Sequence, residues 1–353
     1  MQKKLIALAV AALASGAAFA QSNVTIYGNV DVGFSHRGDH QAKGVSGQNA
    51  IDSGISDDSY VGFKGVEDLG NGLKALFVLE AAFTADNGSS TGSLFEKQAF
   101  LGLTGNFGTA IAGRLVAPRY SLIAATDPFG DGTVGRFHNV FNDLQFAGVD
   151  IVDVDRVNNA VAYVSPSFSG FNVTAAYATN AVGTENLENS GDARVYTVLP
   201  RYTNGPLDIG VAYQQIKVRD TNIKTKQWTV AGSYDLKVVK LGAWYDTDKI
   251  NALGFKSKAF GLGATVPFGK NAIQVSYNQS KFDGAGFDND KAKQWALGYT
   301  YSLSKRTNFY AAYSDIKNDK KNGVYLRETT VSDANNDGQG YQNGLQFGLK
   351  HSF

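Results

Sequence analysis

The chain closes on GLQFGLKHSF (344–353), a segment in which apolar and polar side chains alternate up to a terminal aromatic residue. Successive side chains of a strand point to opposite faces, so a strand here has one face that is mainly apolar and another that is polar. The first face holds Leu345, Phe347, Leu349, His351 and Phe353, and the second holds Gly344, Gln346, Gly348, Lys350 and Ser352. Such a strand suits the wall of a membrane barrel, with lipid outside and water inside.

The first twenty residues have the pattern of a secretory signal peptide. Lys3 and Lys4 precede the apolar stretch 5–14, and Ala18-Phe19-Ala20 supplies small residues at the expected cleavage site. The apolar stretch is too short to span a bilayer, which needs about 20 residues. We expect residues 1–20 to be removed, which leaves one barrel domain over 21–353.

Composition excludes several classes of protein. Without Lys3 and Lys4 the chain has 33 − 2 = 31 basic residues against 32 acidic ones, so no excess of positive charge exists to bind nucleic acid. There is no cysteine for a disulfide or a thiolate zinc site, and no cofactor is expected. No linker or composition shift divides the sequence, so a single large barrel explains its length better than several soluble domains.

Alternating segments recur along the whole chain. In the segment 73–83 the outward face is apolar, with Phe77 at its centre, and Lys74 and Glu80 point inward. Counting all such segments gives sixteen strands, an even number as single-chain bacterial barrels require. The sequence therefore predicts a sixteen-stranded antiparallel transmembrane β-barrel.

The connections between these strands alternate between short and long. Seven short ones are rich in Gly, Pro, Asn and Asp, which suit tight turns: 66–71, 105–108, 165–170, 203–206, 235–237, 267–270 and 302–306. Eight long ones cover 36–58, 84–96, 116–155, 179–191, 215–223, 246–255, 279–291 and 315–341. Outer-membrane barrels have short periplasmic turns and long external loops, which predicts that both termini are periplasmic.

Aromatic residues gather where the predicted strands meet the turns. Rings of this kind form girdles at the membrane interfaces. The girdle residues are Phe107, Phe168, Phe171, Tyr202, Tyr234, Phe268, Tyr301 and Phe309.

Four stretches resemble the general porins of neisserial and β-proteobacterial outer membranes: VTIYGNVDVGF (24–34), FKGVEDLGNGLKALFVLE (63–80), QAFLGLTGNFGTAIAGR (98–114) and RVNNAVAYVSPSFSGF (156–171). The terminal Phe353 also resembles the C-terminal signature of bacterial outer-membrane proteins, through which the barrel-assembly machinery takes up the last strand. The resemblance implies a homotrimer of barrels embedded in outer-membrane lipids, with a third external loop folded into each lumen. It also implies passive diffusion of ions and small hydrophilic solutes, without enzymatic activity.

The third external loop is the longest and the best placed to narrow the lumen. A connection of about 40 residues is unusual unless it is functional or disordered. Its two basic residues are Arg119 and Arg136, and its six acidic residues give a formal charge of −6 + 2 = −4. The acidic residues are Asp127, Asp131, Asp143, Asp150, Asp153 and Asp155.

Strand parity places four cations on the inner wall, namely Lys64, Lys74, Arg114 and Arg156. They match positions that resemble the constriction residues of the porin family. A cationic wall opposite an acidic loop would create a transverse field, and rings of Lys and Arg favour anions. The four wall cations balance the loop charge, and the resemblance adds a weak preference for anions.

Other functions find less support in the sequence. Asp333, Asn335 and Asp337 match the first half of a calcium loop, but position twelve is Gly344 instead of glutamate, which favours an ordinary external loop. The catalytic motifs of serine hydrolases, P-loop enzymes and zinc proteases are absent from the sequence.

Two alternative functions remain open for the same fold. A substrate-specific channel would need a track of inward aromatic residues, and only Tyr27, Phe100, Trp244 and Tyr310 are candidates. A structural or adhesive barrel would act through its external loops and would not conduct.

Overall fold

The computed structural model describes residues 23–38, 47–141, 145–146, 149–150, 155–181, 193–284, 287–318 and 343–353. The predicted signal peptide (1–20) and the candidate calcium residues Asp333, Asn335 and Asp337 lie outside these ranges.

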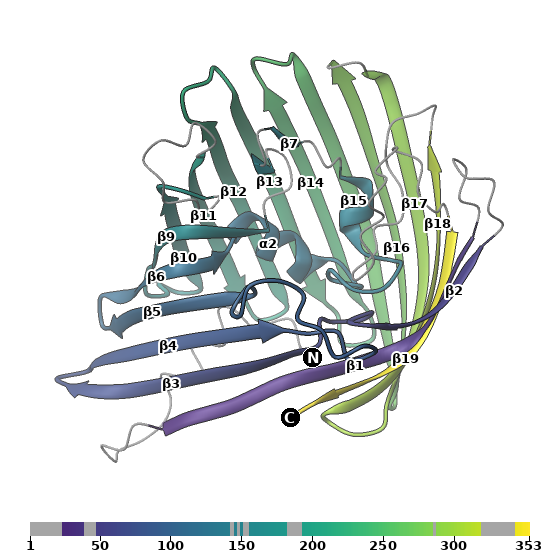
Figure 1. The fold of residues 1–353 in the computed structure, drawn as a ribbon, viewed down its shortest axis with the longest axis horizontal. Helices are drawn as coiled ribbons and strands as arrows, with labels where there is room; N and C mark the ends of the chain where they lie inside the picture. Colours follow the sequence, from purple (N-terminus) through teal and green to yellow (C-terminus); the bar gives the residue numbers. More distant parts are fainter. Residues whose placement is uncertain are drawn as a thin grey trace.

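The described chain forms a closed antiparallel barrel in which each strand pairs with its neighbour and β19 pairs with β1 (Figure 1). Both β2 and β3 pair with β1, in the registers Ser53–Val32 and Tyr60–Asn29, so together they make one barrel strand. This confirms the prediction of sixteen strands. Their bounds are β1 (Asn23–Gly38), β2 (Gln48–Ser53), β3 (Tyr60–Gly70), β4 (Leu73–Ala82), β5 (Gln98–Gly105), β6 (Gly108–Val116), β9 (Arg156–Val164), β10 (Phe171–Ala178), β11 (Ala193–Asn204), β12 (Leu207–Val218), β13 (Lys224–Asp235), β14 (Lys240–Ile250), β15 (Phe255–Phe268), β16 (Asn271–Gly284), β17 (Phe287–Ser302), β18 (Thr307–Asn318) and β19 (Asn343–Ser352).

Short turns fall at one end of the barrel, within or beside the seven predicted segments. At the other end, three predicted loops are wrong in extent. Most of 246–255 and 279–291 continues the strands, and β16 and β17 pair almost to their common tip. Within 36–58, residues 36–38 belong to β1 and 48–53 form β2. The strand ends contain many charged residues, so the sequence predicts a loop there, although the hydrogen bonds between neighbouring strands continue through them.

The two faces of the wall differ as the alternation predicts. Outward side chains such as Leu101 and Val24 are exposed (64% and 59%), whereas inward ones such as Gln214 and Asp246 are buried. Predicted girdle residues, Phe107 and Phe268 among them, are exposed at the turn end. Within the described ranges, no helix is both long enough and apolar enough to cross a membrane.

The terminal residue takes part in closing the barrel. The Phe353 amide donates to the Gly28 carbonyl at 3.1 Å, and the Gly28 amide donates back at 3.3 Å. The Phe353 ring covers Gly28, where a Cβ atom would lie 2.6 Å from the ring. A glycine at this position of β1 therefore lets the end of the chain pack against the wall.

We expect Leu101→Arg to destabilise the barrel by about 2–4 kcal/mol, because it places a cation on the lipid face near the middle of β5. Thr104→Arg puts the same side chain on the lumen face of the same strand and should cost much less. Equilibrium unfolding in lipid vesicles measures both. Equal losses of stability would contradict the assignment of faces.

Candidate functional site

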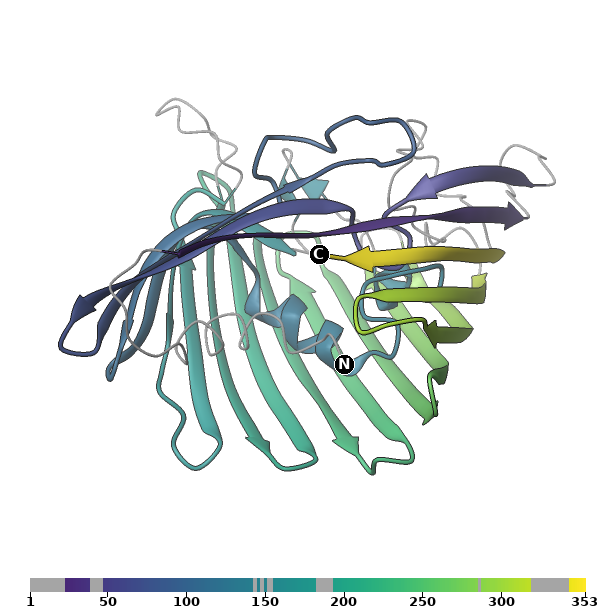
Figure 2. The ribbon, with the colours of Figure 1, turned by 90° about the horizontal axis from the view of Figure 1, so that it is seen from below.

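The described part of the long connection between β6 and β9 lies inside the ring of strands (Figure 2). It contains helix α2 (Pro118–Thr126), the short 3-10 helix η1 (Phe137–Val140) and the small strands β7 (Gln145–Phe146) and β8 (Val149–Asp150). Pro118 at the first helical position suits the start of α2, because proline lacks the amide hydrogen that would remain unpaired there. Helix α2 contacts the inner face of β11 to β14, so the loop lies across one side of the lumen.

A buried ion pair fastens α2 to the wall. The Arg119 Nη2 atom lies 2.6 Å from Asp246 Oδ2 and 3.4 Å from Asp248 Oδ1, and its Nε donates to Thr229 Oγ1 at 3.2 Å. The Arg119 side chain is only 1% exposed. Arg119 therefore anchors the loop and does not line a water path.

Aromatic side chains extend this anchor. The Phe141 ring stacks on Trp244 of β14 with centroids 5.5 Å apart, and Phe137 meets Trp244 edge to face at 6.1 Å. The Arg119 guanidinium lies 5.4 Å from the centre of the Phe141 ring, a favourable cation–π position. Trp244 thus holds the loop and does not belong to an aromatic track.

The tip of the loop is fixed on the opposite side of the lumen. The Val134 amide donates to Gln346 Oε1 of β19 at 2.7 Å, and its carbonyl accepts from Gln294 Nε2 of β17 at 3.0 Å. The Thr133 amide donates to the carbonyl of Ile55. The described part of the loop therefore crosses from β14 to β19.

Three cations gather where β5, β6 and β9 meet this loop, and we call Lys97, Arg114 and Arg156 the cationic cluster. Arg114 donates to the Glu96 carbonyl and, at 2.7 Å, to Asn158 Oδ1. Arg156 Nε donates to the Lys97 carbonyl at 3.1 Å. Both arginines thus fix the backbone of the segment that carries Lys97.

Acidic groups face this cationic cluster. Asp155 Oδ2 lies 2.6 Å from Arg156 Nη1, and Asp58 Oδ2 lies 2.5 Å from Lys97 Nζ and 3.7 Å from Arg156 Nη2. Opposite charges therefore meet at the inner edge of the barrel, where they can act on ions in the lumen.

A second charged group lies within the loop. The Asp131 carboxylate lies 2.7 Å from Arg136 Nη2 and 2.6 Å from His138 Nδ1, and it accepts from the Tyr120 hydroxyl at 2.8 Å. Burial alone would raise the pKa of Asp131, but Arg136 and His138 outweigh it and hold this pKa well below its usual range. Asp131 is therefore ionised at neutral pH, but its charge is largely balanced by its neighbours.

The remaining predicted site residues are dispersed. Lys64 Nζ lies 4.6 Å from the centre of the Tyr27 ring, whose hydroxyl bonds Glu80. Lys74 pairs with Thr104 and Arg114 with Ala99 on the same strand, so Lys74 lies five residues, or about 17 Å, nearer the turns.

Among the other predicted loop acids, only the side chain of Asp127 lies in the described part of the chain, and it does not face the cationic cluster. Asp127 is buried, with its carboxylate accepting from the Phe129 amide at 2.9 Å. Asp143, and the side chains of Asp150 and Asp153, lie outside the described residues.

The inward aromatic residues other than Trp244 are also engaged. Tyr310 is buried and donates to Asp31 at 2.5 Å, while Tyr27 bonds Glu80 at 2.7 Å. Phe100 packs beside the buried cluster that includes Leu115 and Val157. These residues come from separated strands, so their positions favour structural roles over a continuous track for one substrate.

Sequence reasoning missed Lys97 and Asp58. Lys97 precedes the first residue of β5, so strand parity does not fix its direction. Asp58 lies in a segment that was predicted as external loop. The one signal in the sequence for Lys97 is its position directly before QAFLGLTG (98–105), a segment recognisable as a strand.

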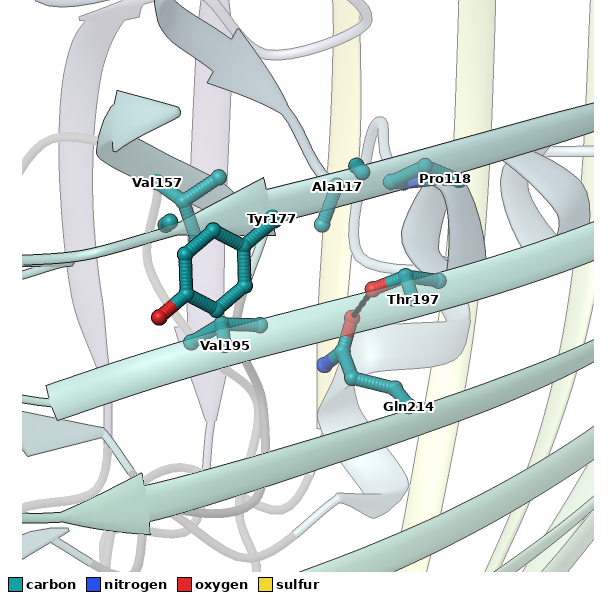
Figure 3. Close-up of a pocket in the computed structure, with 9 residues that line it drawn as sticks. Ala117, Pro118, Val157, Tyr177, Val195, Thr197 and Gln214 are labelled. Atoms are coloured by element: carbon teal, nitrogen blue, oxygen red, sulfur yellow. Dashed lines mark hydrogen bonds between the residues drawn. The ribbon is translucent and has the colours of Figure 1, made fainter. Parts of the chain in front are cut away.

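A small cavity lies at the base of the loop, between Ala117, Pro118 and strands β9 to β12 (Figure 3). Its volume is about 10 Å³, close to the minimum for one water molecule. Thr197 Oγ1 donates to Gln214 Oε1 beside it at 2.8 Å. The cavity is too small for a solute. The described residues also contain no group of three or more His, Cys, Asp or Glu side chains that could hold a metal ion.

Comparison with known proteins agrees with this architecture. The sequence profile of a family described as Gram-negative porin matches residues 7–321. The chain is 34% identical to outer membrane porin protein 32 of Delftia acidovorans over 358 residues, which cover 100% of both chains. It is 32% identical to an outer membrane porin protein of Bordetella pertussis, over 90% of this chain and 95% of that one. The solved anion-selective porin from Comamonas acidovorans matches with a TM-score of 0.79 and 28% identity, over 94% of this chain and 100% of that one.

Proposed function

Because this chain belongs to the family of Gram-negative porins and is an outer-membrane barrel, we propose that it is a general diffusion channel for ions and small hydrophilic solutes. A sixteen-stranded barrel leaves an aqueous lumen unless something fills it. The observation that carries the proposal is the loop anchored across this lumen, with the cationic cluster at its edge. A loop held on two sides narrows a pore without being a mobile plug.

The proposal includes a weak preference for anions. The cationic cluster has three positive charges, and the carboxylates of Asp58, Asp155 and the neighbouring Glu96 supply three negative ones, so the local sum is 3 − 3 = 0. Rings of Lys and Arg favour anions. The relative of known structure that is named as anion-selective supports the same direction, at 28% identity.

Assembly follows from the same proposal. The exposed apolar outer face can contact both lipids and further copies of the chain, and we propose a homotrimer on the basis of the family. The first residue of β1 and the last residue of β19 lie at the turn end of the barrel, which would place both termini in the periplasm. We also propose that the barrel-assembly machinery recognises the last strand, which leads to Phe353.

Planar-bilayer recordings of the purified protein test this function. We expect large conductance steps that scale with salt concentration, because solutes cross a water-filled pore. Steps that saturate with one solute would favour a substrate-specific channel. Complete absence of steps from correctly folded protein would favour a structural or adhesive barrel.

A further inference from the structure

The second barrel strand carries an insertion that points into the lumen. On β1, two residues separate Asn29 from Val32, whereas six residues (54–59) separate their partners Tyr60 and Ser53. The strand made of β2 and β3 is therefore 6 − 2 = 4 residues longer than the stretch of β1 with which it pairs. We call residues 54–59 the inward segment.

The inward-facing carboxylate of Asp31 holds this segment in place. Asp31 Oδ2 accepts from the amides of Ser56 and Asp57 at 2.8 and 2.9 Å. Asn29 Nδ2 donates to the Asp58 carbonyl at 3.0 Å. Gly54, with φ +70°, supplies the left-handed backbone at which the chain leaves β2. The inward segment is thus a fixed part of the wall.

This arrangement brings Asp58 to the cationic cluster from the strand made of β2 and β3, which is separated from β5 only by β4. Asp58 is the most exposed member of the group, at 43%, whereas Lys97 and Arg156 are 13% and 21% exposed. Lys97 Nζ also lies 4.7 Å from the centre of the Tyr60 ring, which fixes the ammonium beside Asp58. An ion passing the cluster therefore meets the Asp58 carboxylate together with the two cations.

We infer that Asp58 is a specificity-determining residue, which limits the anion preference of this pore by cancelling part of the charge of the cationic cluster. The inference rests on the proposed function as a diffusion channel. Without the Asp58 charge, the net charge of the cationic cluster and its acidic neighbours Asp58, Asp155 and Glu96 rises from 3 − 3 = 0 to 3 − 2 = 1. Arg156 keeps its ion pair with Asp155, and the Lys97 ammonium keeps its position over the Tyr60 ring, so both cations remain in place. Lys97 then faces the lumen without the Asp58 carboxylate that balances its charge.

The test is the reversal potential of single channels under a potassium chloride gradient, for wild type and Asp58→Asn. We expect the ratio of chloride to potassium permeability to rise by about threefold, since one charge is removed within about one screening length of the ion path. Asp208→Asn is the matched control. Asp208 pairs with Arg201 at 2.5 Å beside the 205–206 turn, so the same charge change there should have little effect.

A second variant separates charge from structure. Asp58→Asn combined with Lys97→Gln restores the wild-type net charge of 2 − 2 = 0 and should return the permeability ratio towards the wild-type value. Lys97→Gln alone should shift the ratio towards cations, which keeps the inference testable if Asp58→Asn does not fold.

The outcomes are distinct. Equal reversal potentials for Asp58→Asn and Asp208→Asn, or a double variant that stays as far from wild type as Asp58→Asn, would overturn the role of Asp58 and leave the channel function intact. A wild-type protein that forms no conductance steps would overturn the proposed function itself.

Discussion

Replacing Arg114 and Arg156 together by glutamate is expected to turn the channel towards cations, with a change in the chloride to potassium permeability ratio of about tenfold or more. The two substitutions change the local charge by 2 × 2 = 4 units at one level of the lumen. Both side chains lie at the loop edge, where Arg114 donates to Asn158 and Arg156 pairs with Asp155. The reversal potential under a salt gradient measures the change directly.

Lys74→Glu is the control for this prediction. Lys74 also faces the lumen, but it lies about 17 Å nearer the turns, beyond the screening length of about 10 Å at 0.1 M salt. We expect it to shift the potential much less than either arginine. A larger effect of Lys74→Glu would place the narrowest point near the turns and would contradict the site described above. Arg114→Gln with Arg156→Gln should give an intermediate shift.

The barrel could be predicted from the sequence because each strand repeats one simple physical rule. Alternation fixes which side chains meet lipid, as Leu101 and Phe77 on the outer face and Lys74 and Glu80 on the inner face illustrate. The rule fails where the strand leaves the membrane, because both faces are then wet. For this reason most of 279–291 reads as loop although β16 and β17 remain paired there.

The site could be predicted only in part, for a related reason. Parity gives the direction of a side chain but not its height in the lumen, so Lys74 and Arg114 look equivalent in sequence. The partners of a loop residue depend on where the loop lies, and neither spacing nor parity encodes this. The sequence therefore suggests that Arg119 is a cation lining the pore. In the structure it pairs instead with Asp246 and Asp248, which lie more than a hundred residues away in the chain.

Arg119→Met is expected to release the loop from the wall and to raise both the single-channel conductance and its noise. The substitution leaves the carboxylates of Asp246 and Asp248 buried without their cation. Breaking a buried ion pair in this way typically costs about 3–5 kcal/mol. The ladder between β13, β14 and β15 does not involve Arg119, so the barrel should remain closed while the loop detaches.

Three further measurements make this expectation specific. Arg136→Met removes a cation whose partner Asp131 belongs to the same loop and is 19% exposed, so it should change the conductance less. Adding Asp246→Asn to Arg119→Met removes one stranded carboxylate and should recover part of the lost stability. Circular dichroism checks that the strands persist in each variant. If Arg119→Met conducted with the amplitude and noise of the wild type, the loop would have to be held by other contacts, such as Phe141 on Trp244, and the ion pair would not be its anchor.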